Sequence, residues 1–148
     1  MHLSMHNWMR AEPVEVTIAR LAKYGYESIE IGGEPKRYNT KDVKKLLDEH
    51  GIRCWGSVTL MFEGLHLPSP NEKVRAHTVQ YVKDCLTMVK ELDGEILTIV
   101  PGTVGKVNPD ATPEEEWKNA DEGMKEIDAW SKKEGVRIGI EPINRFET

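Results

Sequence analysis

The sequence lacks several features that would assign it to a particular compartment or class of partner. Its 148 residues include only two cysteines, Cys54 and Cys85, which lie far apart and form no CxxC pattern. Both fall on apolar positions of predicted elements, so we expect buried free thiols in a reducing cytoplasm. No apolar run approaches the roughly 18 residues of a transmembrane helix, and no secretory signal is present. We therefore expect a cytoplasmic protein with no membrane partner.

An excess of positive charge is also lacking. The formal net charge of −5 gives no electrostatic footprint for nucleic acid, so we expect no nucleic-acid partner. Glycine-rich phosphate loops are absent as well. The residues that follow the first predicted strand, 6–10, read His-Asn-Trp-Met-Arg and match neither GxGxxG nor a P-loop. This absence counts against a nucleotide-binding sheet.

What is present is one repeated unit: an apolar strand, a polar loop, a capped amphipathic helix, a glycine and the next strand. The predicted strands are residues 3–8, 28–31, 52–60, 95–100 and 136–140. The predicted helices are residues 13–24, 39–50, 69–93 and 112–134. The last two begin with capping-box sequences, Ser-Pro-Asn-Glu at 69–72 and Thr-Pro-Glu-Glu at 112–115. The inner face of the last helix is predicted to carry Trp117, Met124 and Ile127.

The order βαβαβαβαβ predicts parallel strands that are covered by helices. A doubly wound sheet and an incomplete (β/α)₈ barrel both satisfy it, and the missing phosphate loop favours the barrel. We therefore predict an α/β fold in which residues 1–148 form a single domain. This domain is a partial (β/α)₈ TIM barrel with strands one to five and helices one to four. The long polar loops follow strands, so the functional face lies at the carboxyl ends of the strands.

The chemistry concentrates in the last ten residues, 139–148, which read Gly-Ile-Glu-Pro-Ile-Asn-Arg-Phe-Glu-Thr. Glu141 ends the last predicted strand, and Glu147 follows six residues later. A carboxylate at a strand end can act as a base beside a carbonyl group and can bind a hard divalent ion. The alternative for Glu141 is an ion pair with Arg137 or Arg145. The alternative for Glu147 is an ordinary loop carboxylate.

The segment 141–147 resembles the end of the fifth strand in the xylose isomerase-like TIM barrels, the sugar phosphate isomerase/epimerase superfamily. It is most similar to ketose 3-epimerases of the D-tagatose and D-psicose types. The segments 67–75 and 25–31 add weaker similarity. The resemblance implies that Glu141 is a metal ligand and an acid/base group. It implies that Glu147 hydrogen-bonds substrate hydroxyls near the reacting carbonyl.

The resemblance also implies a divalent metal cofactor: Mn, Mg or Co. In the family, an Asp, a His and another Glu from strands six to eight complete the site, and these 148 residues contain no such strands. We therefore expect an incomplete site in this chain, with no bound ion as the alternative. His66, in the third loop, is a further candidate metal ligand, or else an ordinary polar residue.

Three other residues are candidates for binding a sugar. His6 and Trp8 close the first predicted strand, where an aromatic ring can pack against the apolar face of a sugar, although Trp8 could equally belong to the core. Glu34 follows the second predicted strand and is a candidate for the substrate pocket.

The resulting hypothesis is a sugar isomerase or epimerase that acts on a small ketose or aldose by metal-assisted proton transfer through an ene-diolate. A second hypothesis is a non-catalytic half-barrel. Its open sheet would have two unpaired edges and an uncovered inner face, so it would form a homo-oligomer or bind a complementing chain. A third is an endonuclease IV-like phosphodiesterase on the same barrel, against which the acidic balance counts.

Overall fold

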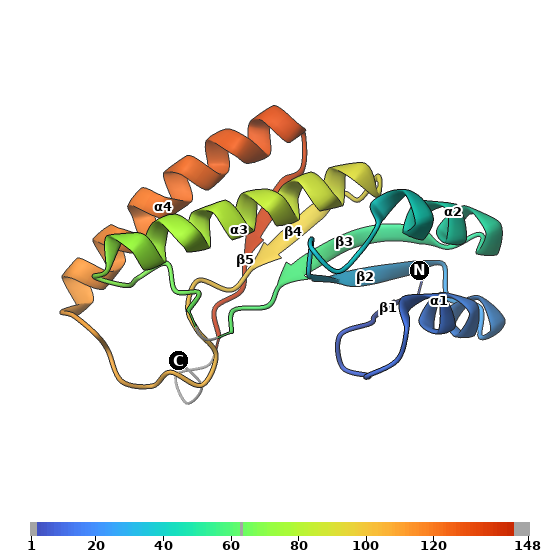
Figure 1. Ribbon diagram of the computed structural model, residues 1–148, viewed down its shortest axis with the longest axis horizontal. Coiled ribbons are helices and arrows are strands. Elements are labelled where there is room, and N and C mark those ends of the chain that lie inside the picture. The colour runs from blue at the N-terminus through green and yellow to red at the C-terminus, as the bar shows by residue number, and fades with distance from the viewer. Residues whose placement is uncertain (1–2, 63, 144–148) are drawn as a thin grey trace.

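The computed structural model describes residues 3–62 and 64–143, which form one parallel sheet whose strands alternate with helices (Figure 1). The strands are β1 (Ser4–His6), β2 (Ser28–Gly33), β3 (Arg53–Thr59), β4 (Ile96–Ile99) and β5 (Arg137–Ile140). The helices are α1 (Val14–Lys23), α2 (Thr40–His50), α3 (Glu72–Glu91) and α4 (Pro113–Glu134). Each strand pairs in parallel with the next along the chain, in the order β1-β2-β3-β4-β5.

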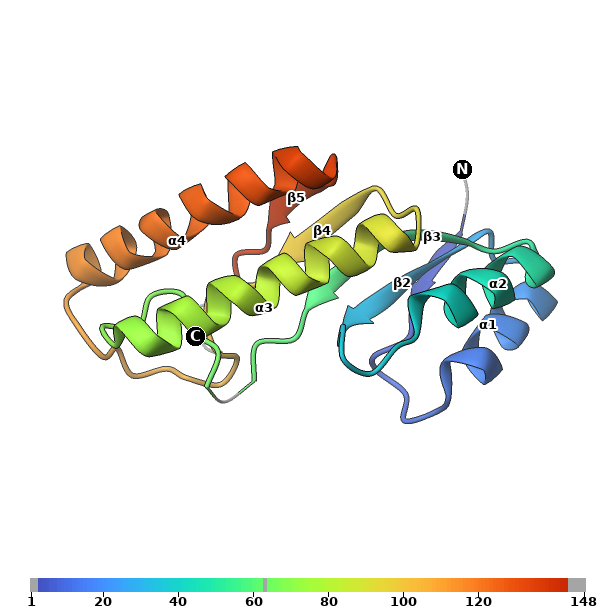
Figure 2. The ribbon, with the colours of Figure 1, turned by 45° about the horizontal axis from the view of Figure 1, so that its top comes forward.

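The sheet is curved, and the helices lie against one of its two faces (Figure 2). Ile29 and Ile31 of β2 are completely buried in a cluster with residues of α1 and α2. Leu97 and Ile99 of β4 are completely buried in a second cluster with residues of α3 and α4. A doubly wound sheet carries helices on both faces and reverses its strand order at a switch point. The sequential order and the one-sided helices therefore confirm the partial (β/α)₈ barrel.

The other face of the sheet carries the alternate residues of each strand, and the strand register places them in rows. The first row consists of His6, Glu30, Gly56, Ile96 and Arg137. The next row consists of Gly32, Val58, Thr98 and Gly139. We call this surface the inner face, because it corresponds to the interior of a closed barrel. The outer edges of β1 and β5 have no strand partner within residues 3–62 and 64–143.

Both cysteines are buried free thiols, as the sequence predicts. Cys54 lies beneath α1 and α2, and Cys85 belongs to the cluster under α3 and α4. Burial raises the pKa of each thiol to about 12, which keeps both protonated and unreactive. Of the helices that the structure describes, none is long and apolar enough to cross a membrane.

Several local predictions differ from the structure. Trp117 is 79% exposed, because the first turns of α4 extend beyond the sheet, whereas Ile127 is buried as predicted (Figure 1). The residue that caps α3 is Asn71, whose side chain accepts a hydrogen bond from the Lys73 N–H. The predicted cap, Ser69, instead accepts from the N–H of Asn71.

Candidate functional site

All five strands end at the same edge of the sheet, because they run in parallel. The loops that follow them, including residues 34–39, 60–71 and 100–112, therefore gather at this edge. The candidate residues of the site lie at strand ends or in these loops. This is the carboxyl edge at which a TIM barrel carries its active site.

Glu141 is the first residue beyond β5. Its N–H donates a 2.9 Å hydrogen bond to the carbonyl oxygen of Ile99, which continues the sheet by one step past the strand. Its side chain is exposed, and no ion pair engages it in the described part of the chain. The proposed pairing with Arg137 is not found, because Arg137 forms its ion pair with Glu95, at 3.2 Å, at the opposite end of the strands. The backbone thus fixes Glu141 at the carboxyl edge, and within residues 3–62 and 64–143 no ion pair occupies its carboxylate.

Glu147, the other predicted catalytic residue, lies outside the described residues, and so does Arg145. The role of Glu147 stays a prediction.

His6 and Trp8 form an aromatic pair at the end of β1. Their rings stack with centroids 4.4 Å apart and planes 25° apart. Trp8 is 41% exposed, so it is not a core residue. Its Nε1–H donates a 3.4 Å hydrogen bond to Oε2 of Glu30, which lies on the inner face. The pair therefore presents an aromatic surface to the inner side of the sheet.

Asn7, between His6 and Trp8 in the sequence, fastens the end of β1 to β2. Its Oδ1 accepts a 2.8 Å hydrogen bond from the N–H of Gly32, and its Nδ2 donates one of 3.1 Å to the hydroxyl of Tyr38. The backbone N–H of Asn7 also donates to the carbonyl oxygen of Glu30. The strand ends at His6, two residues earlier than predicted, and these bonds hold Asn7, which precedes Trp8, against β2.

Glu34 lies in a different environment from the aromatic pair. Its carboxylate forms a 2.7 Å ion pair with Arg37 in the same loop. It lines a cavity of about 370 Å³ between the loops after β2 and β3 and the side of α3. Phe62 and Tyr81 form other walls of that cavity. The structure therefore places Glu34 beside α3, among groups that do not include His6 or Trp8.

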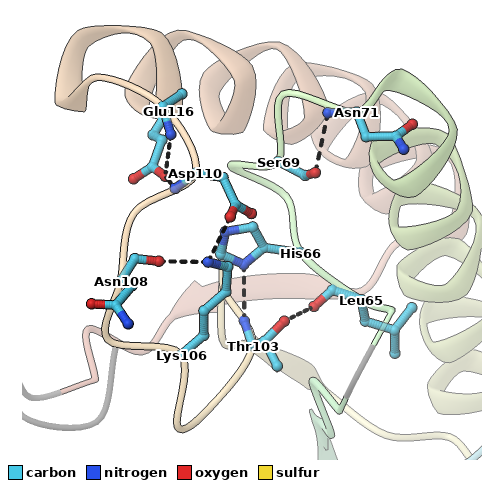
Figure 3. Close-up of polar contacts among 10 residues, drawn as sticks. Leu65, His66, Ser69, Asn71, Thr103, Lys106, Asn108, Asp110 and Glu116 are labelled. Atoms are coloured by element: carbon cyan, nitrogen blue, oxygen red, sulfur yellow. Dashed lines mark hydrogen bonds and ion pairs between the residues drawn. The ribbon is translucent and has the colours of Figure 1, made fainter.

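His66 joins the loops that follow β3 and β4 (Figure 3). Its Nδ1 accepts a 3.1 Å hydrogen bond from the N–H of Thr103, whose hydroxyl donates to the carbonyl oxygen of Leu65 at 2.6 Å. Burial, together with the nearby ammonium group of Lys106, lowers the pKa of His66. The neutral ring that accepts at Nδ1 carries its proton on Nε2. With this bond in place, neither ring nitrogen offers a lone pair to a metal, so the geometry favours a role in holding the loops.

A cavity of about 400 Å³ lies beside His66, between these two loops and the chain after β5. Its charged lining groups are held by bonds to the loop that follows β4. Nζ of Lys106 donates to the carbonyl oxygen of Asn108 and to Asp110, at 2.5 and 2.9 Å (Figure 3). Oε1 of Glu116 accepts from the N–H of Asp110 at 2.8 Å. These bonds order the loop around the cavity, whose lining includes Pro142, the residue after Glu141.

The described residues do not form a metal site by themselves. No group of three or more His, Cys, Asp or Glu side chains that could hold an ion occurs within residues 3–62 and 64–143. Glu141 could supply one oxygen ligand, and the rest of a ligand set would have to come from elsewhere.

The sequence reading missed Glu30 and Asn7 as parts of the site. Strict alternation along β2 indicates that Glu30 faces away from Ile29 and Ile31, and this signal was available from the sequence. The bond from Asn7 to Gly32 joins residues 25 positions apart, which no local pattern reveals.

Comparison with known proteins identifies the family to which the chain belongs. Residues 18–148 match the model of the xylose isomerase-like TIM barrel family. An uncharacterised protein of Methanocaldococcus jannaschii is 26% identical over 139 residues, which cover 91% of this chain and 46% of that protein.

Solved structures share the fold at low identity. A D-psicose 3-epimerase of Clostridium cellulolyticum H10, solved with D-tagatose, has a TM-score of 0.86 and 19% identity over 100% of this chain and 54% of its own. A D-allulose 3-epimerase of Methylomonas sp., solved with D-allulose, has a TM-score of 0.86 and 24% identity over 98% of this chain and 52% of its own. A 3-keto-D-glucoside 4-epimerase of E. coli has a TM-score of 0.80 and 15% identity over 98% of this chain and 57% of its own.

The chain spans about half the length of these relatives. The family match includes residues 141–147, the segment on which the sequence resemblance rests. The chain belongs to the xylose isomerase-like TIM barrel family, and its described residues form five consecutive strands of such a barrel.

Proposed function

We propose that the protein, with its barrel completed, is a sugar isomerase or epimerase that transfers a proton at carbons adjacent to a carbonyl group. The observation that carries the proposal is the position of Glu141, fixed by its backbone bond to Ile99 at the carboxyl edge with its carboxylate exposed. The epimerases that share the fold support a sugar as the substrate.

Glu141 would act as the base. Removing a proton from a carbon next to a carbonyl requires a basic atom about 3 Å away and gives an ene-diolate. Return of the proton to the neighbouring carbon isomerises the sugar. Return to the opposite face of the same carbon epimerises it and requires a second proton carrier on that face. Glu147 would hydrogen-bond the substrate hydroxyls near this carbon.

His6 and Trp8 would form the wall that receives the sugar. An exposed indole on the inner side of the sheet can pack against the C–H groups of a sugar ring or chain. A wall at the end of β1 and a base at the end of β5 would hold the substrate between them and fix the reacting carbon near Glu141.

The family implies a divalent ion, which when bound would stabilise negative charge on the oxygens of the ene-diolate. Glu141 is the described residue best placed to be one ligand. Within residues 3–62 and 64–143 there is no group of three such side chains, so the other ligands would come from residues outside these ranges.

Proton exchange with solvent tests the proposal. The full-length protein is incubated in D₂O with a panel of ketoses and aldoses, and loss of the C–H signals is followed by proton NMR. Glu141→Gln keeps the side-chain size but cannot accept the proton, so exchange should slow by about 10²–10⁴-fold. Glu122→Gln, which changes an exposed carboxylate on α4, should leave the rate unchanged. Absence of exchange in the wild type across the panel, or full exchange in Glu141→Gln, would refute the proposal.

We also propose that residues 1–148, taken by themselves, associate. The outer edges of β1 and β5 carry unpaired backbone groups in the described structure, and Ile140 at one of these edges is 59% exposed. Such edges favour pairing with another strand. Sedimentation velocity on this polypeptide should show a species larger than 16.8 kDa. A monomer at micromolar concentration would contradict the proposal.

A further inference from the structure

Glu30 lies in the middle of β2 on the inner face of the sheet. Its neighbours along the strand, Ile29 and Ile31, are completely buried under α1 and α2, so the side chain of Glu30 points the other way. In the register of the sheet it lies beside His6 of β1. A carboxylate here would face the interior of a closed barrel, where a charged group requires a hydrogen-bonding partner.

Trp8 supplies that partner, and three neighbouring residues determine where its indole lies. Its Nε1–H points to Oε2 of Glu30 at 3.4 Å, and the ring of His6 stacks on it at 4.4 Å. At the base of the side chain, a Cβ on Gly32 would lie only 3.1 Å from Cβ of Trp8. The absence of a side chain at Gly32 therefore lets Trp8 lie close to β2. The indole is nevertheless 41% exposed, which leaves surface for a ligand.

We propose that Glu30 is a positioning residue that fixes the orientation of the Trp8 indole, and through it the aromatic wall that receives the sugar. This inference rests on the proposed function for the substrate, and on the described contacts for the orientation. His6 stacks on the indole and Gly32 makes room for it, but both contacts are compatible with an indole flipped by about 180° about its Cβ–Cγ bond. The hydrogen bond to Glu30 selects one of the two orientations, because only one edge of the indole carries an N–H.

Fixing the ring in advance lowers the cost of binding. A side chain that must be ordered when the ligand arrives reduces the affinity, whereas one that is already ordered does not. Removal of the Glu30 acceptor should therefore raise KM more than it lowers kcat. A carboxylate and an amide both offer an oxygen to the indole N–H, but an aliphatic side chain offers none.

The first test does not depend on activity. In the ¹H–¹⁵N spectrum of the full-length protein, Trp8→Phe identifies the Nε1–H resonance of Trp8. Glu30→Leu should shift this resonance and accelerate its exchange with solvent, whereas Glu30→Gln should preserve slow exchange. Glu15→Leu, which changes an exposed carboxylate on α1, should leave the resonance in place. An unmoved resonance in Glu30→Leu would overturn the inference even if the enzyme is active.

The second test is a double-mutant cycle on KM, with the substrate that the exchange assay identifies. Glu30→Leu should raise KM about tenfold in the wild type and should have no further effect in Trp8→Phe, because that ring has no N–H to orient. An equal increase in both backgrounds would show that Glu30 acts independently of Trp8 and would overturn the inference. Wild-type inactivity on every sugar would refute the proposed function and the substrate role of Glu30, while the resonance test would still decide the orientation.

Discussion

The hydroxyl of Tyr81 donates a 2.7 Å hydrogen bond to the carbonyl oxygen of Gly33 and accepts one of 2.8 Å from the N–H of Leu60. Tyr81 belongs to α3, so this helix ties together the carboxyl ends of β2 and β3. A Cβ on Gly33 would lie 2.9 Å from the hydroxyl oxygen, so the glycine is needed for the close approach. One side chain thus holds two of the strand ends that form the edge of the candidate site.

Tyr81→Phe removes this bridge and leaves two backbone groups without their partner. Because an unsatisfied buried polar group costs about 1–3 kcal/mol, we expect the free energy of unfolding to fall by about that amount. Urea denaturation followed by circular dichroism measures it. Tyr24→Phe removes a hydroxyl from a side chain that is 66% exposed and should change stability by less than about 0.5 kcal/mol. Equal effects of the two substitutions would contradict the bridging role.

The sequence predicted the elements well because their signals are local. Apolar periodicity and the helix-ending glycines located every strand and helix, and Gly25, Gly51 and Gly135 indeed adopt left-handed angles of φ 74°, 63° and 71°. At the end of α3, however, the left-handed residue is Asp93 rather than Gly94. A Cβ on Gly94 would lie 2.8 Å from Cγ1 of Val89, so this glycine is required by packing.

The residue that caps α3, Asn71 in place of the predicted Ser69, can be tested directly. In the structure Asn71 caps the helix, with its Oδ1 3.0 Å from the backbone N of Lys73. Asn71→Ala should therefore lower the free energy of unfolding by about 1 kcal/mol. A capping box beginning at Ser69 would instead use the side chain of Glu72 as an acceptor, so Glu72→Ala serves as the control and should have little effect. A larger loss from Glu72→Ala than from Asn71→Ala would restore the sequence prediction.

The candidate site was less predictable than the fold, because its contacts join distant residues. Glu141 was found from a short motif at a strand end. The roles of His66 and Asn7 depend on partners 37 and 25 positions away, which local periodicity does not identify. The sequence suggested a metal ligand at His66, whereas its hydrogen bond to Thr103 indicates a contact between loops.

This contact predicts a pH dependence of stability. Burial holds the pKa of folded His66 below its ordinary value of 6.5, so the unfolded chain binds the proton first as the pH falls. The free energy of unfolding should therefore decrease as the pH falls below about 6.5, and the full contribution is present above that value. Protonation also places a hydrogen on Nδ1, which can then no longer accept from Thr103. Urea denaturation at pH 7.5 and 5.5 measures the change.

A matched pair of variants assigns that change to one residue. In His66→Asn the amide oxygen can still accept from the N–H of Thr103, but the side chain does not titrate, so the loss between pH 7.5 and 5.5 should shrink. His77→Asn, at an exposed position on α3, should retain the wild-type loss. An unchanged pH dependence in His66→Asn would show that other groups cause it.

The inner face has one position where even a methyl group should not fit. A Cβ on Gly56 of β3 would lie 2.3 Å from the carbonyl oxygen of Ile96 and 2.9 Å from its Cγ2. Relief would require displacement of the β4 backbone, so Gly56→Ala should lower the free energy of unfolding by about 1–3 kcal/mol or more. Gly139→Ala, on β5, places its Cβ 3.6 Å from Cδ1 of Ile96, an ordinary contact, and should be close to neutral. Chemical denaturation of both variants measures the difference, and equal stabilities would show that β3 and β4 are not packed as closely as described.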